Sequence, residues 1–99
     1  MTQLLIAIDS VNWTAVTCPI NCKTVIFDNN ETSAQDVNRR IVDTDANTQK
    51  LIPVGTVYTW EKSADAKPLS SRGFFIAGTT IAYLKSVSGS FNVAVEFIE

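Results

Sequence analysis

The sequence contains no histidine, and this absence removes several kinds of chemistry at once. The Ser-His-Asp triad and the Cys-His pair both use an imidazole as general base, so neither can form in this chain. Histidine-ligated metal centres are excluded for the same reason. The ten acidic residues leave carboxylate catalysis open in principle, but that chemistry depends on a spatial separation that a sequence does not give. We expect a protein that is not an enzyme, and keep a small hydrolase that uses carboxylates as an alternative.

Cysteine is also scarce. The two cysteines, Cys18 and Cys22, lie in the motif Cys-Pro-Ile-Asn-Cys. A structural zinc site needs about four Cys or His ligands, so we expect no zinc site, and no other cofactor is indicated. The pair could close a small disulfide across a loop. Free thiols are the expected state, because the chain starts without a basic segment and the apolar run 4–8 is too short for the core of a signal peptide.

The chain also lacks the features by which proteins bind phosphates and membranes. A net charge of −2 gives no general attraction to nucleic acid. The four glycines are widely spaced, whereas a phosphate-binding loop clusters them. No apolar run approaches the roughly 18 residues needed to cross a bilayer. Arg39 and Arg40 are the only adjacent basic pair, and on a strand they point to opposite faces and form no patch. We expect neither a nucleic-acid nor a membrane partner.

Short runs rich in β-branched and aromatic residues recur along the sequence, separated by clusters of Gly, Pro, Asn, Asp and Ser. This spacing predicts an all-β fold, an antiparallel β-sandwich of jelly-roll or immunoglobulin-like type with about eight short strands. Residues 91–98 give the clearest signal, because apolar and polar residues alternate there. No repeat or shift in composition divides the chain, so residues 1–99 are expected to form one domain. The expected strands are 3–8, 11–17, 23–28, 36–43, 56–62, 73–77, 79–85 and 91–98.

One segment, 33–43, is ambiguous between strand and helix. Ser33 and Asp36 could form a capping box, and Val37 with Ile41 has the i, i+4 spacing of a helix. The segment has too few apolar residues for a helical stripe, which favours a strand.

The residues that follow this segment have some resemblance to a calcium loop. Asp43, Asp45 and Asn47 supply alternating oxygen ligands. Thr48 then stands where the loop requires glycine, and Val54 stands where it requires a bidentate glutamate. The sequence therefore predicts a polar turn, in which Asp and Asn side chains bond to nearby backbone amides.

Two aromatic residues, Tyr58 and Trp60, are the candidate interface residues. They share one face of the predicted strand 56–62, and Val57 and Thr59 take the other face. If Val57 points inward, the pair is exposed and could anchor a protein partner, because Tyr and Trp are frequent in interface hot spots. Burial in the core is the default for each aromatic residue, and exposure of the pair is the alternative to it. Exposed aromatics could also form a stacking or sugar-binding platform, which keeps a carbohydrate-binding module open. The further candidates for that platform are Trp13, Phe74, Phe75 and Tyr83.

The order of the segments resembles that of small virion proteins of tailed bacteriophages. Residues 11–16 (VNWTAV) and 23–29 (KTVIFDN) are similar to the start of these proteins. Residues 38–45 (NRRIVDTD) and 50–55 (KLIPVG) look like their central segment, and residues 78–86 (GTTIAYLKS) with 88–89 (SG) look like their closing hairpin. The cysteines of the first turn depart from the pattern.

This resemblance implies a non-enzymatic virion structural protein, with no catalytic residues to transfer. The implied role is that of a capsid decoration, or cement, protein that binds the outer capsid surface and stabilises the head. Its partners would be the major capsid protein or other virion proteins, and it would be a homo-oligomer, with a trimer as one form. It would be located in the virion, which assembles in the host cytoplasm. A tail, fibre or head-to-tail connector component is the alternative within the virion. The first and last strands are the expected contact edges, because unpaired backbone groups at an edge can pair with another chain.

Overall fold

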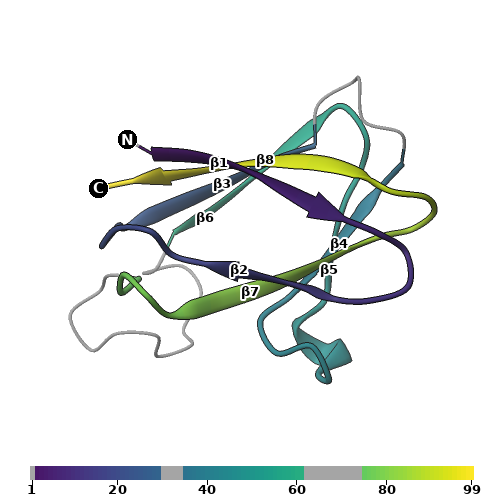
Figure 1. The fold of residues 1–99 in the computed structure, drawn as a ribbon, viewed down its shortest axis with the longest axis horizontal. Coiled ribbons are helices and arrows are strands. Elements are labelled where there is room, and N and C mark those ends of the chain that lie inside the picture. Colours follow the sequence, from purple (N-terminus) through teal and green to yellow (C-terminus); the bar gives the residue numbers. More distant parts are fainter. Residues whose placement is uncertain (1, 30–34, 62–74) are drawn as a thin grey trace.

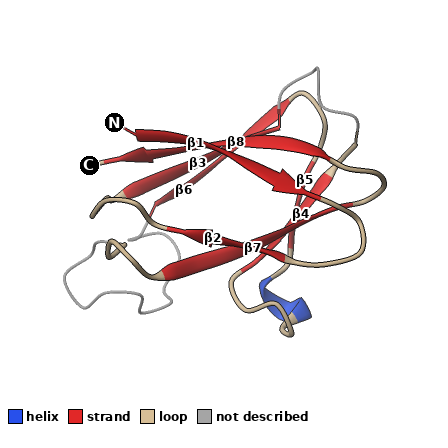
Figure 2. Cartoon of the chain, viewed as in Figure 1, coloured by secondary structure: helices blue, strands red, loops and turns tan. Residues whose placement is uncertain are grey.

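The computed structural model describes residues 2–29, 35–61 and 75–99, and it is a β-sandwich of two four-stranded antiparallel sheets (Figures 1 and 2). The predicted all-β sandwich is confirmed. The first sheet has the order β1-β8-β3-β6, with β1 (Thr2–Ile8), β8 (Phe91–Ile98), β3 (Thr24–Asn29) and β6 (Thr56–Glu61). The second sheet has the order β2-β7-β4-β5, with β2 (Thr14–Thr17), β7 (Thr80–Ser86), β4 (Val37–Arg40) and β5 (Lys50–Ile52). One short 3₁₀ helix, η1 (Ala46–Thr48), precedes β5 within the described residues.

The strand order distinguishes between the two expected sandwich types. The chain passes from one sheet to the other at every connection except that between β4 and β5. The first strand lies beside the last in one sheet, and β2 lies beside β7 in the other. An eight-stranded double sheet of this order corresponds to the jelly roll and not to the immunoglobulin order.

The alternation in β8 determines which residues fill the core. Val93, Val95 and Phe97 are fully buried and Phe91 is half-buried, as the alternation predicts. β8 pairs with β1 along seven residues on one side and with β3 on the other, so it is central in its sheet. Each fully buried side chain of this size stabilises the fold by about 1.5–3 kcal/mol.

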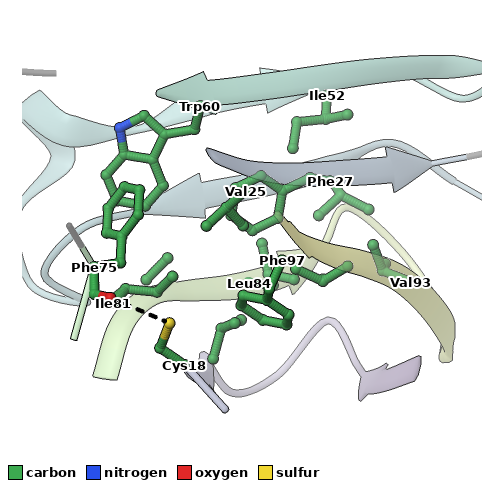
Figure 3. Packing of buried hydrophobic residues seen from close by; sticks show 14 of the residues in the cluster. Cys18, Val25, Phe27, Ile52, Trp60, Phe75, Ile81, Leu84, Val93 and Phe97 are labelled. Carbon is green, nitrogen blue, oxygen red and sulfur yellow. Dashed lines mark hydrogen bonds between the residues drawn. The ribbon is translucent and has the colours of Figure 1, made fainter. Parts of the chain in front are cut away.

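The core lies between the sheets and receives side chains from both (Figure 3). Its aromatic end is formed by Trp60 and Phe75, whose ring centroids are 4.7 Å apart, and Phe27 continues the row 6.2 Å from Trp60. Phe75 comes from the segment before β7 and forms an isolated bridge with Cys22. This bridge connects the turn after β2 to the turn before β7.

Seven of the eight expected strands are present, and the differences have local causes. The strand expected at 11–17 begins only at Thr14, because the Asp9 carboxylate accepts the amides of Val11 and Asn12 at 2.8 Å each and forms a turn. The run 73–77 lies partly outside the described residues, and Phe75 is followed by a turn. Residues 33–34 also lie outside them, but the strand interpretation of 33–43 is confirmed at β4.

Two features were not predicted correctly. β5 was missed, because two of its three residues are exposed and it has no apolar alternation to detect. The expectation that the first and last strands are both edges is right for β1 and wrong for β8, which lies between β1 and β3. β8 is internal because β3 pairs with one of its sides and β1 pairs with the other.

Within the described part of the chain, no helix has the length and apolar character to cross a membrane.

Candidate functional site

The structure places Tyr58 and Trp60 on the inner side of β6. Exposure of the pair required Val57 to point inward, but the Val57 side chain is outward and 57% exposed. Trp60 is 1% exposed and Tyr58 is half-buried. The reason is the β3 ladder, in which Trp60 faces Val25 and Tyr58 faces Phe27, two residues whose side chains are fully buried. The default expectation of burial therefore holds for Trp60 and in part for Tyr58, and the exposed pair that an inward Val57 would have given is not formed.

A buried arginine completes the surroundings of this pair. The Arg39 guanidinium lies 4.6 Å from the centroid of the Trp60 ring and 5.3 Å from that of Tyr58. Its Nη2 donates a hydrogen bond to the Tyr58 hydroxyl at 3.2 Å. The Lys50 ammonium lies 4.8 Å from the Tyr58 ring centroid. Cation–π contacts of this kind reach about 2 kcal/mol when they are desolvated, so this cluster links β4 to β6 across the sandwich.

The outer face of the second sheet carries a different set of aromatic and basic residues. Tyr83 faces both Ala15 and Arg40 in the ladders of β7, so the three share the outer face. Lys85 is two residues from Tyr83 and lies on the same face. The Arg40 guanidinium is 4.6 Å and the Lys85 ammonium 5.6 Å from the ring centroid of Trp13. We call Trp13, Arg40, Tyr83 and Lys85 the outer patch.

The outer patch is held in place by the segment that follows β4. The Arg40 Nε donates to the side-chain oxygen of Gln49 at 2.8 Å, and its Nη1 donates to the carbonyl of Asp43 at 2.9 Å. All four patch residues are half-buried, with part of each side chain exposed. A side chain that is already fixed loses less conformational entropy when a partner binds.

The segment that resembled a calcium loop is the polar turn that the sequence predicted. The Asp45 carboxylate accepts the Asn47 amide at 3.0 Å and caps η1. The Thr48 hydroxyl accepts the Ile41 amide at 3.1 Å. Within the described ranges, no group of three or more acidic or cysteine side chains is placed to hold a metal ion. The turn positions Gln49 for its hydrogen bond with Arg40.

The two cysteines form a buried pair of free thiols, the state expected from the sequence. Their sulfur atoms are 3.5 Å apart, and the Cys18 thiol donates to the carbonyl of Ile20 at 2.8 Å. Burial raises the pKa of the Cys18 thiol. Burial, followed by the hydrogen bond with Cys18, raises the pKa of Cys22 to about 12. Because the thiolate is the reactive form, both thiols are poor nucleophiles at neutral pH.

No family model matches the sequence, and no curated protein or solved structure matches the chain.

Sequence reasoning named two of the four outer-patch residues, Trp13 and Tyr83, as candidates for a stacking or sugar-binding platform, and it considered Arg40 only as part of an adjacent basic pair. The alternation within 79–85 could have placed Tyr83 beside Lys85 on one face. Contact of Lys85 and Arg40 with Trp13 depends on how β2, β7 and β4 pair, and no local pattern reveals that pairing.

Proposed function

We propose that the protein is a non-enzymatic structural component that binds another protein through the outer patch. The arrangement of that patch carries the proposal: one tryptophan, one tyrosine, one arginine and one lysine lie together on an exposed sheet face. Trp, Tyr and Arg are the residue types that dominate interface hot spots. The side chains are half-buried and partly fixed, which lowers the entropy cost of binding.

The charge of the patch favours a particular kind of partner surface. Arg40 and Lys85 place two positive charges beside an aromatic ring, although the whole chain has a net charge of −2. A partner surface with exposed carboxylates beside apolar groups would complement these charges. Complementary charges increase the association rate and fix the orientation of the complex.

The finer proposal is a capsid decoration protein of a tailed bacteriophage, bound to the outer surface of the major capsid protein. The resemblance of residues 11–29, 38–55 and 78–89 to small virion proteins supports this partner. The strand order adds support by analogy, because viral capsid domains are among the users of the jelly roll, together with lectins and cupins. In a capsid, many copies bind one shell, and weak contacts between neighbours gain from high effective concentration.

A sugar-binding role for Trp13, Tyr58 or Trp60 has less support. Trp60 is buried, and cations lie over the rings of both Tyr58 and Trp13. Stacking on a sugar would require an open aromatic face. A protein partner therefore fits the arrangement better than a carbohydrate does.

The test is co-sedimentation of the purified protein with phage heads and, separately, with phage tails. We expect binding to heads that weakens at least tenfold in Trp13→Ala and in the charge reversal Arg40→Glu. Asn92→Ala is the matched control, because Asn92 is exposed on β8 in the first sheet, whereas the patch lies on the second sheet. Binding to tails alone would support the alternative role as a tail, fibre or head-to-tail connector component. Binding to neither would overturn the virion proposal.

A further inference from the structure

Strand β1 is an edge strand without the usual protection against pairing. It occupies one end of the first sheet and, among the described residues, pairs only with β8. Its seven residues, Thr2–Ile8, contain no charged residue and no proline, and its ladder with β8 has no register shift. Natural edge strands are usually kept from pairing with other chains by charges, prolines, bulges or short length.

The other three edges of the described sandwich carry such protection. β2 has four residues and a register shift between Val16 and Thr17. β5 has three residues, begins with Lys50 and is followed by Pro53. β6 has six residues and ends with the charged Glu61. β1 is thus the longest edge strand and, among those described, the one that combines full regularity with an absence of charge.

The side chains of β1 are incompletely covered on both of its faces. Leu5, on the outer face, is 69% exposed. Leu4 and Ile6 face inward and pack against the core, yet both remain only half-buried. Burying apolar area of this kind is worth about 25 cal/mol per Å². A strand placed beside β1 would cover all three side chains together with the free backbone groups.

A second copy of β1 is complementary to the first in an antiparallel register centred on Leu5. A twofold axis perpendicular to the sheet keeps the inner faces of both copies on the same side. Inner residues of β1 have even numbers and outer residues have odd numbers, so an even residue must face an even one and an odd residue an odd one. Centring on Leu5 places all seven residues opposite a partner, with Leu5 facing Leu5 of the second copy and Leu4 facing its Ile6. No charged pair is formed, and about six to eight backbone hydrogen bonds are gained.

We propose that β1 pairs antiparallel with β1 of a second copy, which joins the two first sheets into one continuous eight-stranded sheet. This contact is isologous, because each copy uses the same surface, so it closes at two copies. It therefore favours a dimer over the trimer implied by the family resemblance. The outer patch lies on the second sheet and stays free in this dimer. The inference does not depend on the proposed capsid partner.

The test is the mass of the protein in solution, measured by light scattering and by sedimentation over a concentration series. We expect a dimer for the unchanged chain and a dissociation constant at least 100-fold higher for Leu5→Lys, which would bring two lysines face to face. Val57→Lys is the matched control, because Val57 has a similar exposure on the outer face of the same sheet but lies on β6. A monomer at all concentrations, or a Leu5→Lys dimer as tight as the unchanged one, would overturn the inference.

A second variant decides the matter if Leu5→Lys fails to fold. Directly opposite residues of an antiparallel pair have Cβ atoms about 4.5–5.5 Å apart, which is close to the range that a disulfide requires. We expect Leu5→Cys to form a covalent dimer on mild oxidation and Val57→Cys to remain monomeric on a denaturing gel. Leu5→Cys that does not cross-link any better than Val57→Cys would exclude this register.

Pairing of β1 with a strand of another protein would instead give a monomer when the protein is alone and a mixed complex when that other protein is added. Trp13→Ala should leave the mass unchanged, which separates this test from that of the outer patch.

Discussion

Arg39 and Arg40 are adjacent in the sequence, but their guanidinium groups lie on opposite sides of β4. The group of Arg39 lies between the sheets, 4.6 Å from the Trp60 ring centroid, and that of Arg40 lies outside, 4.6 Å from the Trp13 ring centroid. Because successive side chains of a strand alternate in direction, one arginine can belong to the core and its neighbour to the surface. The two residues should therefore respond differently to the same substitution.

Arg39→Ala should lower the free energy of unfolding by about 2–4 kcal/mol, through loss of desolvated cation–π contacts and of the packing of its aliphatic stem. Arg40→Ala should cost about 1 kcal/mol or less, because its contacts are partly exposed. Urea unfolding followed by tryptophan fluorescence measures both values. Equal losses in the two variants would contradict the assignment of Arg39 to the core cluster.

Apart from Arg39, Asn29 should be the described polar residue whose substitution lowers the free energy of unfolding most. It is fully buried, and its amide donates to the carbonyls of Gln35 at 3.1 Å and Ile52 at 2.8 Å. Asn29→Ala leaves the buried Ile52 carbonyl and the part-buried Gln35 carbonyl without these donors, and loss of a donor to a buried group costs about 1–3 kcal/mol. We expect a total of about 2–4 kcal/mol in denaturant unfolding. The exposed Asn92→Ala should stay within about 0.5 kcal/mol of the unchanged protein.

The sequence was most informative where a strand has one clearly buried face. The alternation in β8 predicted the burial of Val93, Val95 and Phe97 correctly. β5 escaped detection because three residues with two exposed side chains carry no periodic signal. Asn29, the last residue of β3, lies just beyond the expected strand 23–28, and its burial depends on the approach of Gln35 and Ile52.

The candidate site was harder to predict, because it depends on pairing between distant strands. Alternation placed Tyr58 and Trp60 together on one face but could not say which face was inward. That choice depends on β3, whose Val25 and Phe27 face the pair and are buried. The outer patch needs Trp13, Tyr83 and Arg40 to meet, although they come from three segments that are far apart in the sequence. Local pattern gives the direction of a side chain relative to its neighbours, and tertiary packing decides which direction is inward.

The turn between β7 and β8 should depend on the backbone freedom of Gly89. Gly89 has a φ of 72°, a region that other residues enter at a cost of about 1–2 kcal/mol. A methyl group added there would meet no atom within 4 Å, so the whole cost comes from the backbone. Gly89→Ala should lower the midpoint of thermal unfolding by several degrees. Ser88→Ala, in the same turn, should leave it nearly unchanged, and an equal shift in the two variants would exclude the backbone explanation.

The buried thiols should make the protein less stable in alkali. The pKa of Cys22 is raised to about 12 and that of Cys18 is also raised, so in the folded protein both thiols keep their protons to a higher pH than an exposed cysteine, whose pKa is about 8.5. The unfolded chain releases these protons first. The stabilisation from the protonated thiols is therefore complete below about pH 8.5 and is lost as the pH rises toward 12.

The free energy of unfolding, measured with urea between pH 7 and pH 11, should fall more steeply in the unchanged protein than in the double variant Cys18→Ala, Cys22→Ala. All other ionisable groups are the same in the two proteins, so the difference between the two slopes isolates the thiols. Parallel slopes would show that the pair does not contribute to the pH dependence.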